Sequence, residues 1–170
     1  MCGFVGMVCL NKIERNTALD NRFNKAYQLI KPRGPDAKGV WVDESSYFVH
    51  ARLKILDLSS DASQPMRKGN YVICFNGEIY NYNQLRAELI KKGHSFKSNG
   101  DTEILISAWI EWGYTMLEKL DGMFSFAIWN LKNKTLFLAR DRFGKKPLIY
   151  SIKNNYIYFV RTNPHLLNNC

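Results

Sequence analysis

The most chemically suggestive residue of this sequence is Cys2, which is followed by Gly3. Met1 is expected to be removed because the second residue is small, and Cys2 would then carry a thiol and a primary amine. The thiolate is the nucleophilic form of cysteine, and an α-amine titrates near pH ~7.7–8.0, so the amine can accept the thiol proton. One residue would supply both nucleophile and base. In a purely structural interpretation, Cys2 is a small buried residue at the start of a strand.

A second suggestive pair, Asn76 and Gly77, follows the apolar and β-branched run 71–75. The Asn76 side-chain amide and the Gly77 backbone N–H are neighbouring donors. Such donors can stabilise the oxyanion that forms when a nucleophile attacks an amide. Asn-Gly is also a strong turn signal, so the same pair predicts a tight turn after the strand.

Three charged residues could hold a free amino acid by its two charged groups. Arg52 ends an otherwise apolar strand and could bind a carboxylate through two charge-assisted hydrogen bonds. Glu78 and Asp101 could bind an ammonium group. Each has a simpler interpretation: a surface arginine for Arg52, an exposed turn acid for Glu78 and a helix N-cap for Asp101.

Hydrophobic periodicity places these residues on an α+β framework. Helices are predicted over 18–30, from an Asn81 cap to Gly93, and from an Asp101 cap through Trp112. Strands are predicted over 3–10, 39–43, 47–53, 71–75, 123–130, 135–140, 147–152 and 156–160, with a polar loop over 58–69. Because most strands are joined as hairpins, we expect two packed antiparallel sheets with helices outside them.

The length and composition indicate one globular domain. The chain has 170 residues and is 46% hydrophobic, which suffices for a buried core. The net charge is +9, but the basic residues are scattered, and the tightest groups are Lys91-Lys92 and Lys145-Lys146. We therefore expect a solvated basic surface and no nucleic-acid partner.

The cysteines, at positions 2, 9, 74 and 170, form no Cys-x-x-Cys pair. Neither a zinc site nor a redox motif is predicted. No secretory signal is visible, and no apolar run is long enough to span a bilayer. The sequence therefore predicts a cytoplasmic protein with reduced thiols and no membrane partner.

A series of short motifs runs along nearly the whole chain. They are Cys2-Gly3, Arg33-Gly34-Pro35-Asp36, residues 52–56, residues 76–81, Asp101-Thr102-Glu103, residues 120–129 and residues 139–148. In this order they resemble the class II glutamine amidotransferase domain, and most closely the N-terminal glutaminase domain of glutamine-hydrolysing asparagine synthetase.

The resemblance implies an N-terminal-nucleophile hydrolase fold, an αββα four-layer sandwich of two mainly antiparallel sheets. It implies that residues 2–170 form a single type 2 amidotransferase domain, which converts L-glutamine to glutamate and ammonia and needs no cofactor or metal of its own. The implied roles are: Cys2 as nucleophile, Asn76 and Gly77 as oxyanion donors, Arg52 for the substrate carboxylate, Glu78 and Asp101 for its ammonium group, and Leu53, Ile55 and Leu56 as pocket lining. Arg33 and Asp36 are expected to order a loop.

The resemblance also implies a partner that accepts ammonia, a synthetase domain or subunit that would bind ATP and Mg²⁺ and make asparagine. The Ser-Gly-Gly-x-Asp-Ser loop of such synthetases does not occur in this sequence, so the synthetase domain is expected outside this chain. Val160-Arg161-Thr162 also replaces the Ala-Ser-Glu-like run usual in the family. A homodimer is compatible with the sequence.

Three alternatives remain open. The same glutaminase chemistry could feed a different acceptor, such as a sugar or another carboxylate. The chain could instead be a non-catalytic glutamine-sensing or interaction module. A conventional cysteine hydrolase could use Cys74 and His50, although an N-terminal amine removes the need for an imidazole base.

Overall fold

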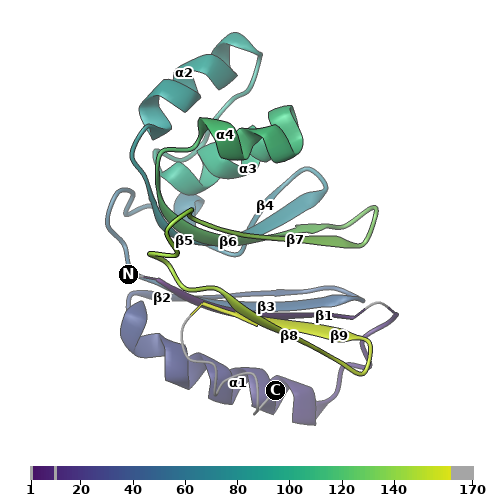
Figure 1. Ribbon diagram of the computed structural model, residues 1–170. Helices are drawn as coiled ribbons and strands as arrows, with labels where there is room; N and C mark the ends of the chain where they lie inside the picture. The colour runs from purple at the N-terminus through teal and green to yellow at the C-terminus, as the bar shows by residue number, and fades with distance from the viewer. Residues whose placement is uncertain (1, 10, 162–170) are drawn as a thin grey trace.

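The computed structural model describes residues 2–9 and 11–161, which form two packed antiparallel sheets (Figure 1). The first sheet has the order β2 (Ala37–Val42), β3 (Ser46–Arg52), β1 (Gly3–Cys9), β9 (Tyr156–Val160) and β8 (Ile149–Lys153). The second has the order β4 (Met66–Lys68), β5 (Tyr71–Ile79), β6 (Gly122–Asn130) and β7 (Thr135–Arg140). Every strand pair is antiparallel, as the hairpin pattern predicts.

Helices cover the outer face of each sheet. α1 (Thr17–Ile30) packs against the first sheet, and α2 (Tyr82–Lys91), α3 (Asp101–Trp112) and α4 (Met116–Lys119) lie over the second (Figure 1). Short 3₁₀ turns occur at Lys31–Arg33, Ser60–Ala62 and Gly113–Thr115. The predicted αββα four-layer arrangement is confirmed.

Three apolar layers hold the sandwich together, because side chains alternate across each strand. On β1, Val5 and Met7 pack beneath α1, whereas Phe4 and Val8 enter the layer between the sheets. β1 is therefore buried on both faces, which explains its unbroken apolar sequence. Arg161 continues the pairing, donating its N–H to Phe4 O at 3.1 Å, while Leu10 and Thr162 lie outside the described residues.

The predicted turn at Asn76-Gly77 is wrong, since both residues lie inside the nine-residue strand β5. Asn76 pairs with Ser125 and Gly77 with Phe124 on β6. The glycine is required by this close approach, because a Cβ at position 77 would lie 2.2 Å from Met123 O. A pattern that commonly marks a turn here marks a strand that must pass tightly against its neighbour.

The predicted N-cap at Asp101 is also wrong, because the cap is Gly100 and Asp101 is the first residue of α3. The Asp101 carboxylate accepts the N–H of Ile79 instead. The predicted loop 58–69 contains the three-residue strand β4, which is too short to give a periodic pattern. Asn81 does precede α2, but its side chain bonds to Lys119 O and Asp121 N.

Candidate active site

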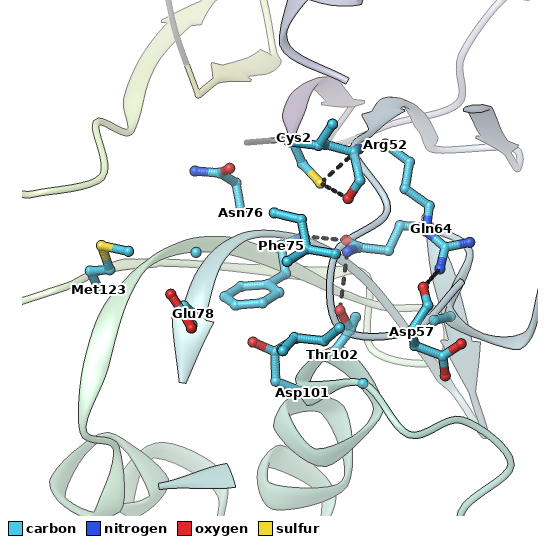
Figure 2. Close-up of a pocket in the computed structure, with 16 residues that line it drawn as sticks. Cys2, Arg52, Asp57, Gln64, Phe75, Asn76, Glu78, Asp101, Thr102 and Met123 are labelled. Atoms are coloured by element: carbon cyan, nitrogen blue, oxygen red, sulfur yellow. Dashed lines mark hydrogen bonds between the residues drawn. The ribbon is translucent and has the colours of Figure 1, made fainter. Parts of the chain in front are cut away.

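One pocket brings together the residues to which the family resemblance assigned a catalytic or substrate-binding role. It opens where β1, β3 and β5 meet the N-terminus of α3 (Figure 2). Its lining includes all of the predicted site residues, namely Cys2, Arg52, Leu53, Ile55, Leu56, Asn76, Gly77, Glu78 and Asp101. The lining residues that the sequence did not suggest are Asp57, Ala62, Gln64, Phe75, Gly100, Thr102 and Met123.

Cys2 stands immediately before β1 and is held by the chain that follows β3. The Leu53 N–H donates to Cys2 Sγ at 3.3 Å, and the thiol lies 3.7 Å from Leu53 O (Figure 2). Burial raises the pKa of the thiol, and the Leu53 N–H and the Arg52 charge oppose that effect. Because the net direction is upward, the sulfur is protonated near neutral pH and needs a base before it can attack.

β4 pairs only with residues 71–73 of β5. Past this point, the same edge of β5 has no neighbouring strand among residues 2–9 and 11–161 to bond its backbone groups. The Phe75 N–H donates to Gln64 Oε1 at 2.6 Å, and the Ile79 N–H donates to Asp101 Oδ2 at 3.2 Å. Strand alternation directs the Gly77 N–H to this same edge, midway between them. On β6, the N–H and O of its partner Phe124 both bond to Asp141, which agrees with a Gly77 N–H that points away from β6. Gly77 therefore presents a backbone donor toward the pocket that it lines.

The Asn76 side chain is a second unused group. Its residue is 1% exposed, and neither Oδ1 nor Nδ2 has a hydrogen-bond partner in the described part of the chain. Figure 2 shows Asn76 and Cys2 at the same end of the pocket. Buried amides are nearly always satisfied, so an unpartnered one beside a thiol is suited to receive a developing negative charge.

Arg52 is buried and already engaged with the loop that follows it. Its Nη1 donates to Ser59 O at 2.7 Å and to Ser63 Oγ at 3.3 Å, and its Nη2 donates to Asp57 O at 2.6 Å. The simple interpretation as a surface arginine is therefore wrong. A guanidinium has five N–H donors, so Arg52 can order this loop and still present donors to the pocket that it lines.

The two acids differ in their surroundings. Asp101 is 7% exposed, and burial together with the nearby Glu78 charge raises its pKa to about 6. Glu78 is exposed at the end of β5 and also lines the pocket. An ammonium group between them would keep both carboxylates ionised.

Gln64 is a buried polar residue of the site that sequence reasoning missed. Its Oε1 holds Phe75 N–H, and its Nε2 donates to Thr102 Oγ1 at 3.1 Å (Figure 2). It thereby ties β5 to the first turn of α3. The only signal was a glutamine before Pro65 in a polar stretch, which does not distinguish a buried bridge from a loop residue.

The alternative pair of nucleophile and base, Cys74 and His50, is poorly placed for hydrolysis. Cys74 is fully buried, and burial strongly raises its pKa. His50 is also buried, its Nε2 lies 3.3 Å from Phe75 O, and burial lowers its pKa to about 4. Neither residue lines the pocket. Within the described residues, no cluster of three or more His, Cys, Asp or Glu side chains could hold a metal ion.

Comparison with known sequences gives a consistent family. Residues 1–170 match the family described as "Glutamine amidotransferase domain". Asparagine synthetase [glutamine-hydrolyzing] 1 of Bacillus subtilis is 39% identical over 169 residues, covering 98% of this chain and 27% of that protein. The protein named Amidase chry2 of Gibberella zeae is 32% identical over 166 residues, covering 91% of this chain and 25% of its own length.

A solved structure has the same fold. It is titled as a glutamine phosphoribosylpyrophosphate amidotransferase from B. subtilis complexed with ADP and GMP, and it superposes with a TM-score of 0.73 over 94% of this chain and 42% of its own. The sequence identity is 19%, so this likeness concerns the fold alone. No helix among the described residues is both long and apolar enough to cross a membrane.

Proposed function

This chain belongs to the glutamine amidotransferase domain family, and we propose that its pocket hydrolyses L-glutamine through a thioester on Cys2. One observation carries the proposal: Cys2, Gly77 and the unpartnered amide of Asn76 line the same pocket. These are the nucleophile and the two donors that attack on an amide requires. The charged residues of the same lining, Arg52, Glu78 and Asp101, match the two ends of a free amino acid.

Binding comes first. Arg52 holds the α-carboxylate of glutamine, while Asp101 and Glu78 hold its α-ammonium group. The loop containing Leu53, Ile55 and Leu56 closes over the methylene groups. Because these contacts fix the amino-acid end, the side-chain amide extends toward Cys2, which converts a bimolecular attack into a positioned one.

The attack then uses both functional groups of Cys2. After removal of Met1, the α-amine accepts the thiol proton, and sulfur forms a bond to the amide carbon. The carbonyl electrons move onto oxygen, where Gly77 N–H and Asn76 Nδ2 donate to the new negative charge. Loss of one such donor typically lowers the rate ~10²–10³-fold.

Collapse of this intermediate breaks the carbon–nitrogen bond. The leaving nitrogen takes the proton held by the α-amine and departs as ammonia, which leaves a γ-glutamyl thioester on Cys2. The amine then removes a proton from water, the resulting hydroxide adds to the thioester, and glutamate leaves as the thiol is restored. No cofactor is needed for any of these steps.

The chain spans about a quarter of the length of the curated relatives it matches. We propose that the ammonia serves an ATP- and Mg²⁺-dependent synthetase domain or subunit in the cytoplasm, and that the product is asparagine. The similarity to Amidase chry2 favours a second candidate, in which the same glutaminase chemistry feeds another acceptor.

The test is release of glutamate and ammonia from L-glutamine by the purified protein. Cys2→Ala should abolish turnover while leaving the unfolding midpoint unchanged. Cys74→Ala is the matched control, because it removes a buried thiol outside the pocket, and it should retain turnover. Intact-mass measurement of the active protein should show Met1 absent. Full activity in Cys2→Ala would refute the proposal.

A further inference from the structure

A polar cross-strand pair ends a row of side chains that is otherwise apolar, and one of its members, Asn76, lines the pocket together with Cys2. The residues of β5 and β6 that face the first sheet pair as Val72 with Trp129, Cys74 with Ala127, and Asn76 with Ser125. The first two pairs belong to the apolar layer between the sheets. The third places a hydroxyl and an amide at the end of that layer where the pocket opens.

Both members of this pair are buried without partners. Ser125 is 0% exposed, and its Oγ has no hydrogen-bond partner among the described residues. The same holds for Asn76 Oδ1 and Nδ2. Burying a hydroxyl without a hydrogen bond is unfavourable, and an alanine would fill almost the same space. Ser46 Oγ is likewise buried and unpartnered, so the position of Ser125 opposite Asn76, and not burial alone, points to a role beyond packing.

The strand register brings the two side chains within reach of each other. Asn76 and Ser125 are direct partners on the same face of the sheet. The Cβ atoms of such partners lie ~4.5–5.5 Å apart, so a rotation about the Ser125 Cα–Cβ bond can bring its Oγ to the Asn76 amide. The amide is an effective oxyanion donor in only one of its two flips, because the other flip would point the lone pairs of Oδ1 at the negative charge.

We propose that Ser125 is a positioning residue for the oxyanion donor. Its hydroxyl donates to Asn76 Oδ1 and thereby keeps Nδ2 directed at the substrate oxygen. This inference rests on the proposed glutaminase function. It assigns Ser125 no contact with the substrate, so its effect is confined to the steps in which the oxyanion exists.

The first test is steady-state glutaminase kinetics of Ser125→Ala. We expect kcat to fall about 5- to 30-fold, a part of the effect of losing a whole donor, with KM within about twofold of the wild-type value. Ser46→Ala is the matched control, since Ser46 is also fully buried but pairs with Val8 at the far end of the first sheet. It should leave kcat unchanged. Ser125→Thr keeps the hydroxyl and should recover most of the lost rate.

A binding measurement separates positioning from a general packing defect. The γ-aldehyde analogue of glutamate adds to a thiol and forms an oxyanion, whereas glutamate itself does not. Ser125→Ala should weaken the aldehyde by the same factor as kcat and leave glutamate affinity unchanged. Equal weakening of both ligands would overturn the positioning role.

A double-mutant cycle distinguishes failure of this inference from failure of the proposed function. In an Asn76→Ala background, Ser125→Ala should change kcat by less than about twofold, because its target is gone. If the two single effects multiply, Ser125 does not act through Asn76 and the inference is wrong while the glutaminase assignment stands. If Asn76→Ala itself leaves kcat unchanged, the oxyanion role of Asn76 fails and the inference falls with it, whereas the glutaminase assignment falls only if Cys2→Ala keeps full activity.

Discussion

The two ends of the layer between the sheets use the same strands for opposite purposes. At one end, which we call the apolar end, Val8, Val72 and Trp129 are closely packed, and Trp129 Nε1 donates to Asp43 Oδ2 at 2.9 Å. At the other, the pocket end, Asn76 and Ser125 are buried with unpaired polar atoms. The apolar end stabilises the fold through buried apolar side chains, although Ser46 Oγ there also has no hydrogen-bond partner among the described residues, whereas the pocket end gathers an unpartnered amide and an unpartnered hydroxyl on facing strands.

This contrast shows how a site can leave buried polar groups without hydrogen bonds and still be well ordered. Asn76 lies only four residues along β5 from Val72, and Ser125 lies four residues along β6 from Trp129. The strands are fixed by packing at the apolar end, so the backbone at their pocket end stays in place, and the bond proposed from Ser125 has only to orient the Asn76 amide. Functional groups on such rigid elements are preorganised.

The largest effect is expected from a cavity at the apolar end. Trp129→Ala should lower the free energy of unfolding by about 3–5 kcal/mol, because it removes a large buried ring. At a temperature where the variant is still folded, kcat and KM for glutamine should stay near wild-type values. Urea unfolding and steady-state kinetics measure the two quantities. A variant that kept its stability but lost activity would contradict the division between the ends.

The reverse outcome is expected from Asn76→Leu at the pocket end. Replacing this amide with an apolar side chain of similar size should change the free energy of unfolding by no more than about 1.5 kcal/mol, since the one hydrogen bond lost is that proposed from Ser125. The kcat should fall ~10²–10³-fold, as for other oxyanion donors. The same urea and kinetic measurements apply. Marked destabilisation would mean that Asn76 stabilises the fold, which contradicts a side chain kept for oxyanion binding.

A smaller change is expected from Arg52→Ala, with its main effect on KM. A charge-assisted contact contributes about 1.5–3 kcal/mol, so KM should rise roughly 10- to 150-fold while kcat changes less. The bonds from Arg52 to Asp57 O and Ser59 O would also be lost, so the loop should become more sensitive to proteolysis. Arg52→Lys should recover only part of the affinity. A fall in kcat alone would argue against carboxylate binding.

The smallest expected effect is a pH dependence that arises at Asp101. Its pKa in the empty pocket is raised to about 6, first by burial and then by Glu78. The ionised form binds the substrate ammonium group, so affinity is retained above this pH and lost as the pH falls through it. For Cys2→Ala, which does not turn over, the Kd for glutamine should rise about tenfold from pH 7 to pH 5. Calorimetry with Asp101→Asn as control should show weak binding with no such dependence.

The sequence predicted the framework and the site membership because both depend on local patterns. Apolar runs identified β1 and β3, and helical spacing identified α1. Every residue to which the motif resemblance assigned a catalytic or substrate-binding role lines the pocket.

The errors have a shared physical origin in contacts between distant elements. Asn-Gly usually favours a turn, but pairing with β6 extends the strand through Gly77. Asp101 has the residue type of a helix cap, but Ile79 N–H from β5 takes its carboxylate. Gln64 bridges β5 and α3 from within a polar stretch. None of these partners is close in sequence, so no local pattern could reveal them.

The most direct measurement is rapid acid quenching of the protein during glutamine turnover, followed by peptide mass mapping. A γ-glutamyl thioester should be found on an N-terminal peptide that begins with Cys2, and it should disappear on treatment with hydroxylamine. An adduct on Cys74, or an acylated peptide that still begins with Met1, would contradict attack by an N-terminal thiol assisted by its own amine.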